Sequence, residues 1–184
     1  MLRLTVPVVT ALLYASIASA QTVTVAGGKT ARSNTTGHDA YRAEVNFGWK
    51  PDAWANGNWT LSINHALAAM TFRDRNNVNA ISWAPNIILT RHSKTGLVPY
   101  LQLGFGVAYL SDDKFESEPK KHPMYQLQGI TNMGSHWQFE SSLAVGLKKN
   151  RFGVRAKIYH YSNAELAHEN EGMDVAEFGL SYSF

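Results

Sequence analysis

The C-terminal segment "AEFGLSYSF", residues 176–184, alternates apolar side chains with polar or small ones. Its apolar set consists of Ala176, Phe178, Leu180, Tyr182 and Phe184. Successive side chains of a β-strand point to opposite faces, so this period of two predicts a strand with one apolar face. Residues 152–158 repeat the pattern with apolar side chains at the even positions. The last part of the chain therefore predicts two strands whose apolar faces can lie on the same side of a sheet.

The same alternation recurs along the chain and gives eight predicted strands. They lie at about residues 21–27, 39–49, 57–72, 78–92, 97–110, 135–148, 151–162 and 174–184. An even number of antiparallel strands is typical of bacterial outer-membrane barrels, and eight-stranded barrels have a lumen filled by side chains. The sequence thus predicts an all-β fold, an eight-stranded antiparallel transmembrane β-barrel that closes by pairing the last strand with the first. The terminal Phe184 resembles the C-terminal signature by which the outer-membrane assembly machinery recognises its substrates.

The composition agrees with a barrel and excludes other classes. The mean hydropathy is −0.23, yet 11% of the residues are aromatic. No apolar run of helix-spanning length follows residue 20, and cysteine is absent, which excludes disulfides and thiolate metal sites. The net charge of +3 is scattered without a basic run, so no nucleic-acid partner is expected.

The predicted polar face distinguishes a membrane barrel from a soluble one. A soluble lipocalin-type barrel would turn its apolar face inward around a ligand, whereas a small membrane barrel turns it outward to lipid. The opposite face here carries many charged and amide groups, which need a hydrogen-bonded interior. These residues are Arg42, Glu44, Asn46, Gln138, Glu140, Arg155, Lys157 and Glu177.

Residues 1–20, "MLRLTVPVVTALLYASIASA", have the three parts of a secretory signal peptide. Arg3 is followed by an apolar stretch and by the small-residue pattern Ala18-Ser19-Ala20. An N-terminal membrane anchor is the alternative, but Pro7 interrupts the stretch, which is shorter than a spanning helix requires. We expect cleavage before Gln21, leaving residues 21–184 as the barrel.

The predicted connections fall into a short and a long set. The short turns lie near residues 51–56, 93–96 and 149–150, and the long loops at residues 28–38, 112–134 and 163–173. The link at residues 73–77 is short although it falls among the long set. Because outer-membrane barrels have short periplasmic turns and longer extracellular loops, we expect both termini in the periplasm and the long loops outside the cell.

The segment "IYHYSNAELAHENEGMD", residues 158–174, contains three reactive side chains at positions that are predicted to face lipid. His160 and Ser162 continue the even-numbered apolar set of one strand, and Asp174 is in phase with the outward set of the next. If the two antiparallel strands pair His160 with Asp174, their Cβ atoms lie about 5 Å apart. An acid, an imidazole and a hydroxyl in reach form the set needed for an activated serine nucleophile. Spacing alone leaves open that these are interfacial polar residues at a hairpin entry.

Several segments resemble one family. The motif "HYSNA" at 160–164, with "FGVRA" before it and "ENEGMD" at 169–174, resembles the C-terminal signature of the PagL family of lipid A 3-O-deacylases. "LVPYLQLGFGVAYLS" at 97–111 and "WQFESSLAVGLK" at 137–148 resemble that family's fifth and sixth strands. The resemblance implies an outer-membrane barrel esterase that removes the 3-hydroxyacyl chain at position 3 of lipid A in the outer leaflet.

The resemblance also implies roles for individual residues. Ser162 would be the nucleophile, His160 the general base and Asp174 the triad acid, at a position where the family often has Glu. The resemblance further implies that Asn163 contributes to the oxyanion hole, that Asn170 lies near the substrate, and that Phe139 lines the acyl-chain side. Glu165 stands where the family commonly has Gly.

The expected partners are lipid A or lipopolysaccharide as substrate, outer-membrane lipid, and the assembly machinery during biogenesis. No cofactor is expected. No metal is expected either, because the acidic residues of the loop at 112–118 lack the spacing of a calcium site. Two alternatives remain: a non-enzymatic structural or adhesive barrel, and a catalytically impaired relative. The sequence leaves a homodimer open.

Overall fold

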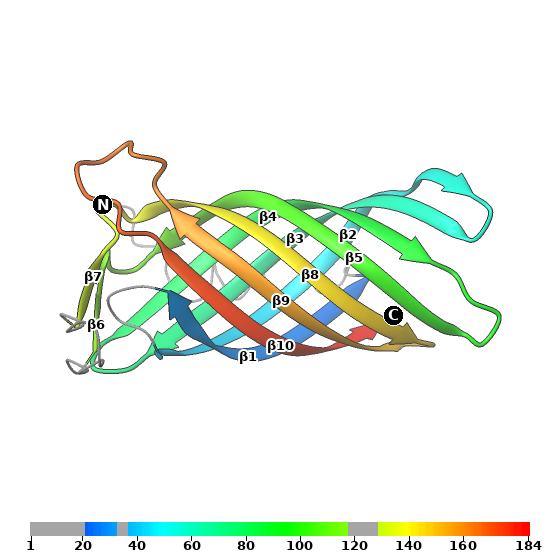
Figure 1. Cartoon of the computed structure of the whole chain (residues 1–184), viewed down its shortest axis with the longest axis horizontal. Helices are drawn as coiled ribbons and strands as arrows, with labels where there is room; N and C mark the ends of the chain where they lie inside the picture. The colour runs from blue at the N-terminus through cyan, green and yellow to red at the C-terminus, as the bar shows by residue number, and fades with distance from the viewer. Residues whose placement is uncertain (1–20, 33–36, 118–128) are drawn as a thin grey trace.

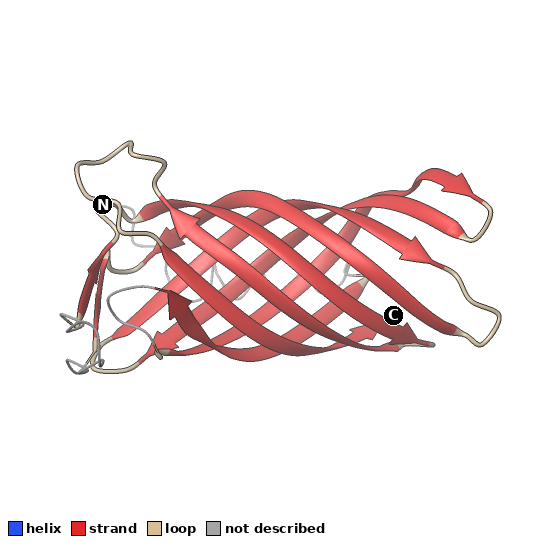
Figure 2. Cartoon of the chain, viewed as in Figure 1, coloured by secondary structure: helices blue, strands red, loops and turns tan. Residues whose placement is uncertain are grey.

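The computed structural model describes residues 21–32, 37–117 and 129–184, so the predicted signal peptide at 1–20 lies outside the described residues. The described chain forms one closed antiparallel barrel with the strand order β1-β10-β9-β8-β5-β4-β3-β2 (Figure 1). Figure 2 shows strands and loops in the described part and no helix. No helix among these residues is long and apolar enough to cross a membrane.

The barrel has the eight strands that the alternation predicted. Their bounds are β1 Thr22–Arg32, β2 Asp39–Asn56, β3 Trp59–Arg73, β4 Asn77–Arg91, β5 Leu97–Leu110, β8 Trp137–Lys149, β9 Phe152–Ser162 and β10 Met173–Ser183. Pairing of β1 with β10 closes the sheet, as expected for a sheet without free edges. The short strands β6 Lys114–Glu116 and β7 Ile130–Asn132 form a separate sheet within the predicted loop at 112–134. This pair was not predicted from the sequence.

Two predicted strand ends were wrong. β1 does not end at residue 27 but continues along β10 to Arg32, with a register shift after Thr30. β2 does not turn at residues 51–56 but pairs with β3 up to Asn56. Two register shifts between Gly48 and Trp54 accommodate Pro51, whose missing N–H is tolerated at such irregularities. The β2–β3 hairpin consequently extends beyond the barrel at the end that carries the C terminus (Figure 1).

The faces of the strands follow the predicted parity. Outward side chains are apolar and exposed, for example Leu103 at 53% and Phe105 at 61%. Inward polar side chains are buried, as Arg42 at 3% and Glu140 at 0% show. The eight inward polar residues named from the sequence are all buried. The fold is thus the reverse of a soluble barrel, with apolar groups outside and polar groups within.

The lumen is filled by a network of ion pairs. Its six charged side chains are Arg42, Arg155, Lys157, Glu44, Glu140 and Glu177. Glu140 accepts from Arg42 Nη2 at 2.9 Å and lies 3.3 Å from Lys157 Nζ. Glu44 accepts from Arg42 Nε at 2.8 Å and also pairs with Arg155, which reaches Glu177 at 3.0 Å. Each buried charge therefore has at least one opposite charge in contact, which offsets its desolvation.

A buried apolar cluster covers this network at the end away from the C terminus. Phe115 of β6 packs edge-on against Phe72 of β3, which in turn meets Tyr161 of β9. The Tyr161 hydroxyl donates to Glu140 Oε2 at 2.9 Å. Tyr161 thereby anchors the inward face of β9, and its neighbours His160 and Ser162 must point outward.

The network predicts a large loss of stability when one carboxylate is neutralised. Glu140→Gln keeps the side-chain volume but leaves Arg42 and Lys157 short of one negative charge in the lumen. We expect the free energy of unfolding to fall by about 3 kcal/mol, measured by denaturant titration of the folded barrel in detergent micelles. Glu116→Gln, at an exposed position of β6, is the matched control and should leave it unchanged. Equal stability of the two variants would contradict this role of the network.

Candidate active site

An imidazole and a carboxylate meet on the outer wall of the barrel. The register of β9 and β10 sets His160 opposite Asp174, the pairing that was assumed from the sequence. His160 Nδ1 lies 2.6 Å from Asp174 Oδ1, and the two side chains are 47% and 34% exposed. The shorter Asp thus reaches the imidazole without displacing either strand. With Nδ1 engaged by the carboxylate, Nε2 is the ring nitrogen that can accept a proton.

Ser162 is the next outward residue of β9 after His160. In the β8–β9 register it lies opposite Phe139, and it is only partly exposed. No hydrogen bond joins its hydroxyl to His160 among the described residues. The structure therefore brings His160 and Asp174 into contact. Ser162 lies on the same face, two residues after His160 and at the end of β9.

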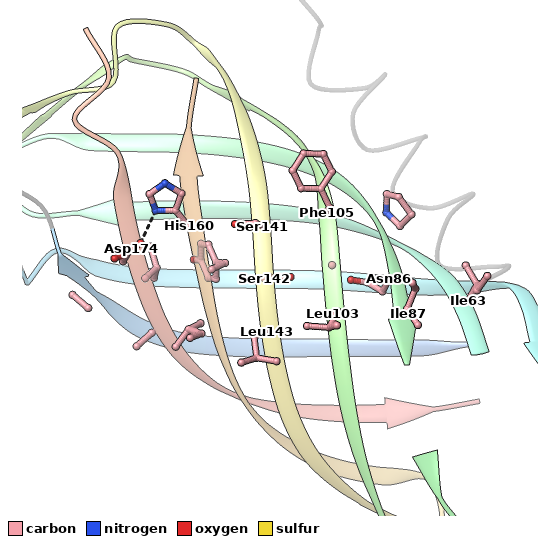
Figure 3. A pocket seen from close by; sticks show the side chains of 17 residues that line it. Ile63, Asn86, Ile87, Leu103, Phe105, Ser141, Ser142, Leu143, His160 and Asp174 are labelled. Carbon is pink, nitrogen blue, oxygen red and sulfur yellow. Dashed lines mark hydrogen bonds and ion pairs between the residues drawn. The ribbon is translucent and has the colours of Figure 1, made fainter. Parts of the chain in front are cut away.

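The strand register arranges the outer wall around this pair in parallel rows. One row runs across β5, β8, β9 and β10 and contains Phe105, Ser141, His160 and Asp174. The adjacent row, further from the loops, contains Leu103, Leu143, Ile158 and Ala176. A hollow is lined by residues of both rows, and Figure 3 shows Ser141 beside His160, with Leu143 and Leu103 in the apolar row. The row that contains His160 and Asp174 thus borders a row of aliphatic side chains on the outer wall.

Gly172 packs against the imidazole from the loop before β10. Its φ is +64°, and a Cβ there would lie 3.0 Å from His160 Cε1 and 3.4 Å from Nε2. The left-handed conformation and the close approach both favour glycine. Absence of a side chain at Gly172 therefore keeps the Nε2 edge of His160 open.

The segment after Ser162 is a tight turn. Leu166 N donates to Asn163 O at 3.1 Å, and the two residues between them, Ala164 and Glu165, have φ of +53° and +62°. This pattern belongs to a type I′ turn, which favours Asn and Gly at its centre. A Gly at position 165, which the resemblance implied, would suit this conformation, whereas Glu165 adopts it at a cost of about 1–2 kcal/mol.

Both amide groups of Asn163 take part in holding the loop. Its side-chain Nδ2 donates to the carbonyls of Met133 at 2.9 Å and Glu169 at 2.7 Å, and its backbone N–H donates to Asn170 Oδ1 at 3.1 Å. The two asparagines that the family resemblance implied are therefore in contact with each other. Asn170 fixes the backbone directly after Ser162.

The remaining predicted residues lie as follows. Phe139 faces outward, pairs with Ser162 in register and stacks on Phe105 with ring centroids 6.0 Å apart. His168 is exposed in the loop. Within the described ranges, no group of His, Asp or Glu residues has the arrangement of a metal site.

Two residues of the site were not predicted from the sequence. Ser141 interrupts the apolar positions of its strand, and its odd number puts it on the outward face with Phe139 and Leu143. This gap in the alternation was the signal that could have found it. Gly172 could not be assigned because its contact with His160 depends on the path of the loop, which alternation does not describe.

Comparison with known proteins identifies the family. The family model described as "PagL: Lipid A 3-O-deacylase" matches residues 39–183. The chain belongs to the PagL family. It is 28% identical to the lipid A deacylase PagL of Pseudomonas aeruginosa over 174 residues, covering 91% of this chain and 90% of that protein. It is 25% identical to the lipid A deacylase PagL of Bordetella bronchiseptica over 142 residues, covering 73% and 71%.

Solved structures share the fold. The crystal structure of the outer membrane enzyme PagL superposes with a TM-score of 0.73 at 21% identity, over 89% of this chain and 99% of that one. Neisserial surface protein A gives a TM-score of 0.51 at 8% identity, over 89% and 95%. Membership of the PagL family and the closed barrel together assign the chain to the outer membrane.

The Gly172 contact predicts a variant that disturbs His160 without unfolding the barrel. Gly172→Ala should displace the imidazole and shift the His160 Cε1–H resonance in NMR spectra of the protein in micelles. Gly57→Ala is the control, because Gly57 has a φ of +58° and a Cβ there would meet nothing within 4 Å. Both variants should lose about 1 kcal/mol of stability for the left-handed backbone. An unchanged His160 resonance in Gly172→Ala would refute the contact.

Proposed function

We propose that this chain is a serine esterase that hydrolyses the ester-linked 3-hydroxyacyl chain at position 3 of lipid A in the outer leaflet. The observation that carries the proposal is the hydrogen bond between His160 and Asp174 on the lipid-facing wall. A charged group facing hydrocarbon is costly, by about 2–4 kcal/mol near the midplane for a cationic side chain and less near the interface. Family membership supports lipid A as the substrate.

The proposed chemistry uses the three side chains in turn. His160 Nε2 takes the proton of Ser162 Oγ, which attacks the ester carbonyl carbon. The tetrahedral intermediate collapses as the carbon–oxygen bond to the sugar breaks, and the imidazolium returns the proton to the leaving sugar oxygen. Water, deprotonated by His160, then hydrolyses the acyl-enzyme and releases the 3-hydroxy fatty acid. Asp174 holds the ring and stabilises the imidazolium throughout.

The loop after Ser162 supplies the proposed oxyanion contact. We assign the Asn163 backbone N–H to the developing oxyanion, for which it would exchange the bond that it donates to Asn170 Oδ1 in this structure. Such a donor contributes about 3–4 kcal/mol to an acyl transfer. Phe139, directly across from Ser162, is placed to contact the acyl chain.

The location of the site fits a substrate that stays in the membrane. The site lies at the barrel end with the long loops, opposite the end that carries the C terminus (Figure 1). With that end outside the cell, the ester linkage near the lipid A sugars would be level with Ser162. The acyl chain could then lie along the apolar rows of the wall.

The nucleophile is tested by lipid A mass spectrometry. In a bacterium with unmodified lipid A, expression of the wild-type chain should remove one 3-hydroxyacyl group, and Ser162→Ala should not. Ser93→Ala, in a turn at the opposite end, is the matched control and should behave as wild type. Unmodified lipid A with the wild type would instead support a non-enzymatic barrel or a catalytically impaired relative. Full activity of Ser162→Ala would exclude Ser162 as the nucleophile.

The acid is tested separately. Asp174→Asn preserves the shape of the side chain but removes the charge that stabilises the imidazolium. We expect the rate of deacylation to fall about 10²–10⁴-fold with the fold retained, measured on purified protein in micelles. Asp39→Asn, which removes a surface ion pair with Lys29 at 2.9 Å, should change the rate little. An unchanged rate in Asp174→Asn would remove Asp174 from the triad.

A further inference from the structure

The wall around the site is apolar with few exceptions. Between the strand ends, the outward side chains of β5, β8, β9 and β10 are aliphatic or aromatic, except Ser141 and His160. Asp174 and Ser162 are polar as well and lie at the strand ends next to the loop. Three of these four polar groups form the proposed triad. Ser141 is the polar residue that the proposed mechanism does not use.

The hydroxyl of Ser141 is exposed on the lipid-facing wall. Among the residues that the structure describes, it makes no hydrogen bond. A hydroxyl that faces hydrocarbon without a partner is unfavourable. A hydrogen-bonding group on the substrate would remove this cost, whereas the hydrocarbon of the membrane offers no such group.

Ser141 occupies a defined place relative to the reacting groups. It lies directly opposite His160 in the β8–β9 register, so their Cβ atoms are about 4.5–5.5 Å apart. Ser162 is its diagonal neighbour on the same face, at about 7–8 Å. On its other side it pairs with Phe105, and Leu143 follows it in the apolar row. Figure 3 shows Ser141 between His160 and Phe105, and all three residues line the hollow.

We infer that Ser141 is a specificity residue whose hydroxyl binds the 3-hydroxyl group of the acyl chain that is removed. The inference rests on the proposed function. In the acyl ester, C3 is two bonds from the carbonyl carbon that Ser162 attacks. If the acyl chain runs from Ser162 along the wall into the hollow, its first three carbons lie beside Ser141. Its remaining methylene groups then lie on Leu143 and the apolar row.

This pairing would make the enzyme prefer 3-hydroxyacyl esters over plain acyl esters. A site built to bond a substrate hydroxyl leaves its own polar group unpaired when the substrate lacks that hydroxyl. One neutral hydrogen bond corresponds to about a tenfold preference. Without Ser141, the wall would treat both chains alike apart from their hydrophobicity.

The test compares two nitrophenyl esters of equal chain length, one with a 3-hydroxyacyl chain and one without. The measured quantity is the ratio of their kcat/KM values with purified protein in micelles. Wild type should favour the hydroxylated ester about tenfold. Ser141→Ala should reduce this ratio to near one by losing rate on the hydroxylated ester alone. Ser141→Thr, which retains a hydroxyl, should keep the preference, and Thr71→Val on β3 is a distant control that should match wild type.

The outcomes separate the two proposals. A wild-type ratio near one, or an equal loss of rate on both esters in Ser141→Ala, would overturn the role of Ser141 while the deacylase assignment stands. A wild-type protein that releases no fatty acid from either ester or from lipid A would overturn both.

Discussion

The structure depends on one constraint: in hydrocarbon, every backbone N–H and C=O must be paired within the protein. A sheet meets this condition only when it closes, and the antiparallel pairing of β1 with β10 closes it. Closure fixes the register of each strand, and the period of two then assigns each side chain to lipid or lumen. The apolar outer wall and the polar interior are both consequences of this closure.

The interior turns this sheet into a rigid support. Buried ion pairs join strands that are distant around the barrel, as the contact between Glu44 of β2 and Arg155 of β9 shows. Tyr161 connects that network to β9 through Glu140 and fixes the face on which its neighbours lie. A reactive group on a strand held in this way keeps its geometry better than one on a loop. The His160–Asp174 pair is therefore positioned from inside the barrel although it lies outside.

The outer wall combines two requirements that usually conflict. A lipid substrate needs an apolar surface, whereas ester hydrolysis needs an acid, a base and a nucleophile. The row arrangement separates them: His160 and Asp174 lie in one row, and the next row offers only aliphatic side chains. The loop at 163–172 joins the ends of β9 and β10 beside this pair. Gly172 of this loop packs against the imidazole.

The sequence alone determined the eight barrel strands and their inward and outward faces, because these follow from a local period of two repeated along the chain. It put His160 and Asp174 on the same face, but the register that pairs them came from the structure. It failed where local signals misled: Pro51 predicted a turn, but bulges carry β2 past it to Asn56. Only the tertiary structure decided the β6–β7 sheet, the packing of Gly172 on His160, and the place of Ser141 across from that imidazole. These features join residues far apart in the chain, and their contacts depend on loop path and strand register, which no local pattern specifies.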